Sequence, residues 1–459
     1  MMLRDFFFGR SEPKVIPKVE PVVPEISDDQ PRNRYNEIFI LSGHTEFVDS
    51  IVKIDNERVL TTGHDKKGII WDTKSGKVLH VLEGHLKPIT CSATLGSELY
   101  YTDETDHDAN IDEDPVILVT ASSDHTLRVW DLMSGKCLKV TQEHNSTVKC
   151  MSLTKDREEP LVVTGGQDIC LWSHSFQLLS KFQRNSLDYV HSVICIKDNK
   201  IVAASDKPEL MVYKVAMEDS EGEQRRTIEL FKKLPPHRES ITCLTPISDA
   251  MFASSSMDGD IICWTTHRLS PTRKFNHYEV FMDYADHTYP YAVPFFMVVD
   301  QRYLFAATGT GFAIFDTISD TCLMRKTYSH YAQVTCMALL DNDRILATSS
   351  SDGTIRLWAS PLPLTTAEAV EANEASCSVS RLFGKRVRDM RFKALQLDLV
   401  GICYGHGNSV KQIVSCNREG FVSCGTDGLI ILWKDAVEQD KREDELMRNI
   451  IEQTGWTEH

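Results

Sequence analysis

Long apolar runs are missing from the sequence. The amino-terminal segment has three consecutive apolar residues, Phe6 to Phe8, before charge and proline return, and this is too short for the core of a signal peptide. The next candidate, Tyr291 to Val299, contains Pro294 and is too short to span a bilayer. We therefore expect a cytoplasmic protein without direct membrane insertion, which reaches a membrane only through its partners.

The sequence has little that would hold a nucleic acid or a metal ion. Lysine and arginine total 50 against 66 aspartates and glutamates, which gives a net charge of −16 and repels polyanions over most of the surface. The 13 cysteines include no C-x-x-C pair, and most lie in apolar, strand-like runs, which is typical of reduced, buried thiols. We expect no nucleic-acid partner, no disulfide framework and no metal site.

Catalytic motifs are missing as well. The patterns H-E-x-x-H, G-x-S-x-G and G-x-x-x-x-G-K-[ST] do not occur, and each would be needed for a different class of enzyme. Gly309-Thr310-Gly311 lacks the third glycine of a dinucleotide site and links two strand-like segments, so it predicts a turn. We expect no enzymatic activity and no cofactor.

What the sequence does contain is a repeat of about forty residues. Glycine-histidine pairs precede tryptophans at Gly43-His44, Gly84-His85 and Gly405-His406, and weaker copies begin at His144, His237 and His330. Two further units have Tyr213 and Phe315 where the tryptophan should stand. The chain therefore has eight units.

In five units an aspartate lies six residues before the tryptophan. A turn that begins with aspartate joins two short strands, and the even offset keeps aspartate and tryptophan on one face of the sheet. These units resemble WD repeats, in which histidine, a serine or threonine, aspartate and tryptophan form a hydrogen-bonded tetrad. The expected tetrads contain His44, Asp65 and Trp71; His85, Asp124 and Trp130; His237, Asp258 and Trp264; His330, Asp352 and Trp358; and His406, Asp427 and Trp433. Because these triads recur in every intact unit, we interpret them as structural.

The predicted fold is an all-β, eight-bladed WD-repeat β-propeller with a short C-terminal helix. Residues 1–35 are proline-rich and predict a flexible N-terminal segment, and residues 36–434 form the propeller. The strand Glu37–Leu41 is expected to complete the eighth blade, because an open ring would expose unpaired edges. Residues 435–459 predict an amphipathic helix, whose stripe of Leu446, Met447, Ile450 and Ile451 contacts either the propeller itself or a partner.

Two insertions interrupt the repeat on what should be one face of the ring, leaving the other face bare. The acidic insertion, residues 96–115 in the second unit, lacks the ordered spacing of a calcium loop and is interpreted as a solvated loop. The basic insertion, residues 360–394 in the seventh unit, interleaves cations with apolar residues. It is either a docking loop or a solvated one, and the docking residues would be Arg381, Leu382, Phe383, Gly384, Lys385, Arg386 and Arg388.

Particular segments are more specific than a generic repeat. NRYNEIFILSGH, TGGQDICLW, LFAATGTGFAIFD and YGHGNSV with VSCGTDGLIILWK resemble the WD repeat-containing protein 41 family between about Asn33 and Lys434. The resemblance implies a scaffold subunit of a longin-DENN complex that regulates autophagy and small GTPases. It also implies recruitment to the lysosomal membrane through a cationic amino-acid transporter, bound by the loop that contains Arg381 to Arg388. The DENN-domain partner would contact Ile38 and Leu446 to Ile451.

An alternative function is a substrate receptor for a cullin ubiquitin ligase, or a reader of modified peptides. Cullin receptors usually have an arginine two residues after the W-D pair. Here Trp71-Asp72 is followed by Thr73-Lys74, and Trp130-Asp131 by Leu132-Met133, so the arginine is missing from both.

Overall fold

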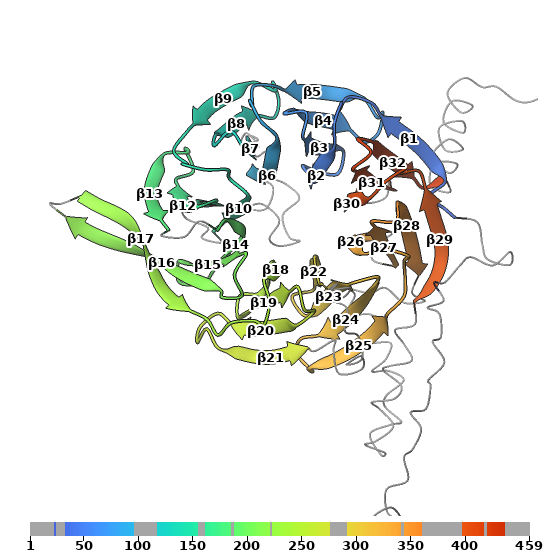
Figure 1. Ribbon diagram of the computed structural model, residues 1–459. Coiled ribbons are helices and arrows are strands. Elements are labelled where there is room, and N and C mark those ends of the chain that lie inside the picture. Colours follow the sequence, from blue (N-terminus) through green and yellow to red (C-terminus); the bar gives the residue numbers. More distant parts are fainter. Residues whose placement is uncertain are drawn as a thin grey trace, which may run out of the picture.

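Eight four-stranded antiparallel sheets are arranged radially around a central axis in the computed structural model (Figure 1). The structure describes residue 23 and residues 33–95, 117–154, 161–184, 188–220, 223–275, 292–340, 344–359, 397–416 and 420–436. The prediction of an eight-bladed all-β propeller is confirmed. In each blade we call the strands a to d from the axis outward.

The first four blades follow the order of the chain. Blade 1 contains β2 (Val48–Lys53), β3 (Arg58–Gly63), β4 (Gly68–Asp72) and β5 (Val78–Leu82); blade 2 contains β6 (Ile89–Leu95), β7 (Ile117–Ser122), β8 (Leu127–Asp131) and β9 (Cys137–Thr141). Blade 3 contains β10 (Cys150–Leu153), β11 (Val162–Gly165), β12 (Asp168–Trp172) and β13 (Leu178–Gln183); blade 4 contains β14 (Val190–Ile196), β15 (Lys200–Ser205), β16 (Met211–Ser220) and β17 (Glu223–Lys233).

The last four blades return to the start of the ring. Blade 5 contains β18 (Ile241–Ser248), β19 (Met251–Ser256), β20 (Ile261–Thr265) and β21 (Pro271–Phe275); blade 6 contains β22 (Phe296–Val299), β23 (Tyr303–Thr308), β24 (Gly311–Asp316) and β25 (Thr321–Lys326). Blade 7 contains β26 (Val334–Leu340), β27 (Ile345–Ser350), β28 (Thr354–Ala359) and β29 (Asp398–Tyr404); blade 8 contains β30 (Val410–Ser415), β31 (Gly420–Gly425), β32 (Ile430–Lys434) and β1 (Glu37–Leu41).

The core is divided into clusters, and each lies at the seam between two neighbouring blades. Trp71 packs with Val422 and Leu432 between blades 8 and 1, for example, and Trp358 packs with Phe312 between blades 6 and 7. Tyr213 and Phe315 occupy the corresponding positions at their own seams. An aromatic residue at this place in every unit therefore fills the gap between successive sheets, which holds the ring together by apolar burial.

The ring closes through its two ends, as the sequence predicted. Strand β1 pairs antiparallel with β32, with Glu37 opposite Lys434 and Leu41 opposite Ile430. The closure extends beyond the amino-terminal end of β1, because Arg34 forms an ion pair with Asp435 at 2.5 Å and Tyr35 is buried in the core between blades 7 and 8. The packed part of the chain thus begins before residue 36.

Strands β16 and β17 form a long hairpin that projects outward from blade 4 (Figure 1). Its base covers blade 3, where the Ile228 amide donates to the Ser180 hydroxyl at 3.1 Å. The two predicted insertions, residues 96–115 and 360–394, lie outside the described residues, so the expectation that they share one face stays a prediction.

Candidate interaction site

The repeated hydrogen-bond network is complete in blades 1, 2, 7 and 8. In blade 1, the Thr61 hydroxyl lies 2.9 Å from His44 Nε2 and accepts from the Trp71 indole at 2.8 Å, while His44 Nδ1 lies 2.8 Å from the Asp65 carboxylate. The distance from Nδ1 to the carboxylate is 3.1 Å for His85 and Asp124, 3.2 Å for His330 and Asp352, and 3.0 Å for His406 and Asp427. The Trp130, Trp358 and Trp433 indoles donate to Thr120, Thr348 and Ser423.

Blade 5 keeps only half of this network. His237 Nε2 lies 2.7 Å from the Ser254 hydroxyl, which also accepts from Trp264 at 2.8 Å. His237 Nδ1 and one oxygen of Asp258 are buried without a hydrogen-bond partner, because the other Asp258 oxygen is held by the Ser256 hydroxyl and the Asp260 amide. The expected bond between His237 and Asp258 is thus not formed.

Blade 3 departs in a similar way. His144 Nε2 lies 2.7 Å from the Thr164 hydroxyl, but its Nδ1 lies against the Cys170 sulfur at 3.8 Å. The turn of blade 3 is shortened, with Asp168 four residues before Trp172 in place of six, and the Asp168 carboxylate accepts from the Asn145 amide at 3.3 Å. In the six blades that have the tryptophan, hydroxyl, imidazole and indole therefore form the constant part of the network, and the carboxylate is the variable part.

The protonation states of these groups follow from their burial. Burial lowers the pKa of His144 and His237 to about 4, since the charged imidazolium is poorly solvated there. Burial opposes ionisation of Asp124 too, but the Thr126 hydroxyl and the Leu86 amide bond its carboxylate and lower its pKa to about 2. Burial also lowers the pKa of His85, so near neutral pH the blade 2 pair contains a carboxylate beside a neutral imidazole.

These networks do not have the geometry of a hydrolytic triad. The hydroxyls of Thr61, Thr120 and Thr348 belong to residues with no solvent exposure, and each is already bonded to an indole and an imidazole. A nucleophile must reach a substrate and must have a base free to accept its proton. The networks therefore fasten strands b and c to the preceding loop of the blade.

Most of the thiols are buried. Among the described residues no cysteine forms a disulfide, and burial raises the pKa of Cys91, Cys195 and Cys403 to about 12. No group of three or more histidine, cysteine, aspartate or glutamate side chains in the described ranges could hold a metal ion. In the same ranges, no helix is long and apolar enough to cross a membrane.

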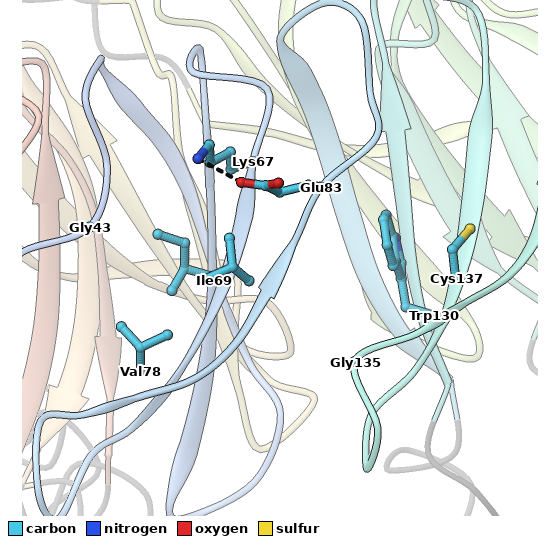
Figure 2. Close-up of a pocket in the computed structure, with 9 residues that line it drawn as sticks. Gly43, Lys67, Ile69, Val78, Glu83, Trp130, Gly135 and Cys137 are labelled. Atoms are coloured by element: carbon cyan, nitrogen blue, oxygen red, sulfur yellow. Dashed lines mark ion pairs between the residues drawn. The ribbon is translucent and has the colours of Figure 1, made fainter.

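A groove of about 500 Å³ lies on the outer wall at the seam of blades 1 and 2 (Figure 2). Val78 and Val81 line it from β5, Trp130 from β8, Gly135 from the turn that follows, and Cys137 from the start of β9. Lys67 and Glu83 line it as well and form an ion pair at 2.7 Å. The groove therefore combines apolar side chains with charged ones.

The docking residues expected from the sequence are only partly covered by the structure. Ile38 lies on β1 with 44% of its surface exposed, beside the end of β32. The basic loop residues Arg381, Leu382, Phe383, Gly384, Lys385, Arg386 and Arg388 fall outside the described residues. The helical residues Leu446, Met447, Ile450 and Ile451 do so as well.

Comparison with known proteins decides the family. The family model described as WDR41, a β-propeller, matches residues 2–444. The chain belongs to the WDR41 family. It is 26% identical to human WD repeat-containing protein 41 over 459 residues, which cover 95% of this chain and 94% of the relative. Against the mouse protein of the same name the identity is 25%, with the same coverage of both chains.

Comparison with solved structures supports the propeller fold and nothing beyond it. The crystal structure of the computationally designed Ika8 protein matches 86% of this chain and 98% of its own with a TM-score of 0.58 and 19% identity. Membership of the WDR41 family and the propeller fold together make this chain a WD-repeat protein of the scaffold type.

Proposed function

We propose that this chain is a non-catalytic scaffold subunit of a longin-DENN complex that regulates autophagy and small GTPases and is recruited to lysosomes. The observation that carries the proposal is the family match over residues 2–444, which includes the whole propeller and the first part of the C-terminal segment. The closed ring is consistent with it, because a rigid propeller offers several separate rims to different partners.

Two contacts follow from this proposal. The DENN-domain partner binds the wall where the ends of the chain meet, through Ile38 on β1 and the stripe of Leu446, Met447, Ile450 and Ile451. The pairing of β1 with β32 and the ion pair between Arg34 and Asp435 support this location. They bring the start and the end of the propeller chain to one place. A rigid, pre-formed edge lowers the ordering cost of association.

The second contact uses the basic insertion. It leaves the ring between β28 and β29, and its cations from Arg381 to Arg388, together with Phe383, would bind an acidic surface of a lysosomal cationic amino-acid transporter. The chain itself would remain in the cytoplasm and would not insert into the membrane.

Co-purification from cells tests both contacts. The Ile38→Asp variant is expected to weaken binding of the DENN-domain partner at least about tenfold, since a charge in a buried apolar contact costs more than about 1.4 kcal/mol of binding free energy. The matched control is Thr272→Asp, because Thr272 is the exposed residue at the corresponding position of β21 in blade 5. Equal recovery of the partner with both variants would contradict the proposed contact.

The loop is tested in the same assay. Replacing Phe383, Arg386 and Arg388 by alanine is expected to abolish co-purification of the transporter and to abolish lysosomal localisation. The DENN-domain partner should still co-purify. Recovery of cullin-ligase subunits in place of longin and DENN proteins would instead support the substrate-receptor alternative.

A further inference from the structure

Exposed apolar side chains gather on the outer strands of three consecutive blades. Six of them lie at equivalent positions, two on each d strand, and their exposed fractions range from 43% to 60%. We call this set the outer apolar belt: Ile38 and Ile40 on β1, Leu79 and Val81 on β5, and Leu138 and Val140 on β9. Strands β1, β5 and β9 follow one another around the outer rim (Figure 1).

The belt is a property of these blades and not of d strands in general. Strand β21 of blade 5 has the same pattern of exposure along its length, but its exposed positions hold Thr272 and Lys274. The outer strand forms whether these exposed positions hold apolar residues or polar ones, so strand formation does not require the apolar residues. Contiguous exposed apolar surface on a soluble domain usually marks a contact.

The belt is continuous across the seams. The Gly76 turn of blade 1 lies so close to blade 8 that an added Cβ would meet Leu41 at 3.2 Å, and at Gly135 of blade 2 it would meet His80 at 2.8 Å. Each turn therefore packs directly on the d strand before it. The groove of Figure 2 lies within the belt, between β5 and β9.

One margin of the belt is basic. Exposed Lys77 and Lys136 follow the two glycine turns of blades 1 and 2. Lys434 lies over the Phe39 ring at 4.7 Å and donates to the Lys74 carbonyl at 2.7 Å. An occupant of the belt should accordingly combine an apolar stripe with negative charge.

The last described residues of the chain end at this margin. Ala436 donates its amide to the Arg34 carbonyl at 3.0 Å, immediately before β1 begins. Residues 437–459 follow, with seven acidic residues against three basic ones and the apolar stripe of Leu446, Met447, Ile450 and Ile451. A helix over residues 437–453 would be about 25 Å long, which is enough to cross more than one strand of the belt.

We propose that residues 437–459 dock along the outer apolar belt of their own chain, with the apolar stripe on β5 and β9 and the acidic face toward Lys77 and Lys136. The docked segment covers the belt in the free protein, so a DENN-domain partner that binds Ile38 and the apolar stripe must first displace the segment from β5 and β9. The docking concerns the chain alone and holds whether or not the longin-DENN proposal is correct.

Hydrogen exchange on the purified full-length chain, without any partner, tests this docking. Amides from Leu446 to Ile451 are expected to exchange at least about tenfold more slowly than in an unstructured peptide. The Leu79→Thr, Leu138→Thr double variant gives the belt the residue that blade 5 has, and it is expected to abolish the protection. Thr272→Leu is the matched control and should leave the protection unchanged.

The competing occupants give different results. Protection that rises with protein concentration, together with a dimer in sedimentation, would assign the belt to a second copy and overturn the proposal. Fast exchange of residues 446–451 in the native chain would also overturn it and leave the belt open for a partner's helix. The charge contact is tested separately by Lys77→Glu with Lys136→Glu, which should lower the protection but not the stability of the ring.

Discussion

The buried histidine of blade 5 predicts how the propeller responds to acid. His237 has an unpartnered Nδ1, and burial lowers its pKa to about 4 in the folded chain, against about 6.5 when unfolded. Between these values the unfolded chain binds a proton that the folded chain does not, so this group destabilises the fold as the pH falls. The contribution is negligible above pH 6.5 and levels off below the folded pKa.

The size of the effect follows from the two pKa values. Lowering the pH from 7 to 4.5 should cost about 2.5 kcal/mol of unfolding free energy from this histidine alone. The variant His237→Gln keeps a polar atom near the Nε2 position, where it can still bond Ser254, but it does not titrate. Its stability should therefore fall less steeply than that of the native chain over the same pH interval.

Denaturant unfolding at several pH values, followed by tryptophan fluorescence, measures this difference. The informative quantity is the change in slope with pH, because the substitution can also alter stability at pH 7. His174→Gln, at an exposed position after β12, is the control. Identical pH dependence for the native chain and His237→Gln would refute the assignment of a neutral, acid-sensitive imidazole to blade 5.

Two further substitutions and one truncation test the ring itself. Thr348→Val keeps the shape but leaves a buried indole and imidazole without their hydroxyl, and it should lower the unfolding free energy by about 2–4 kcal/mol in denaturant titrations; a loss below about 0.5 kcal/mol would contradict the tetrad argument. Removing residues 1–41 unpairs β32 and removes buried Leu41. The free energy of unfolding should fall by at least about 2 kcal/mol, and the chain should aggregate on heating. An unchanged melting temperature would mean that the ring closes without β1. Gly420→Ala places a Cβ 1.8 Å from the Trp433 carbonyl oxygen at a φ of +125° and should be strongly destabilising, whereas Gly407→Ala, with nothing within 4 Å, should be neutral in the same thermal melts.

The regularity of the repeat made most of the fold predictable. Turn chemistry and alternation are local properties, so Asp65 six residues before Trp71 was enough to place a hairpin and its buried face. The number of units then gave the number of blades, and the missing outer strand of the last unit required Glu37–Leu41 to fill it. Even the units with Tyr213 and Phe315 were placed by position alone.

The individual hydrogen bonds were less predictable, because they depend on where a carboxylate turns. Asp258 and Asp352 both lie six residues before the tryptophan of their blade, yet only Asp352 is bonded to the histidine of its blade. The neighbouring Ser256 hydroxyl holds Asp258 in blade 5. In blade 7 the Thr354 hydroxyl and the Tyr331 amide bond Asp352 in a position that also reaches the imidazole. Spacing alone does not distinguish these outcomes.

By itself, the sequence determined the blade, the number of blades and the way in which the ring closes, because each of these follows from short-range pattern. Tertiary structure alone decided which surfaces are continuous. Ile40, Val81 and Val140 are far apart in the chain and unremarkable in their own strands, and they become one exposed apolar belt only because the ring places β1, β5 and β9 one after another around its outer rim. The alternation of residues along a strand determines which face of the strand is buried. Which exposed residues become neighbours on the outer surface depends on how the blades are arranged.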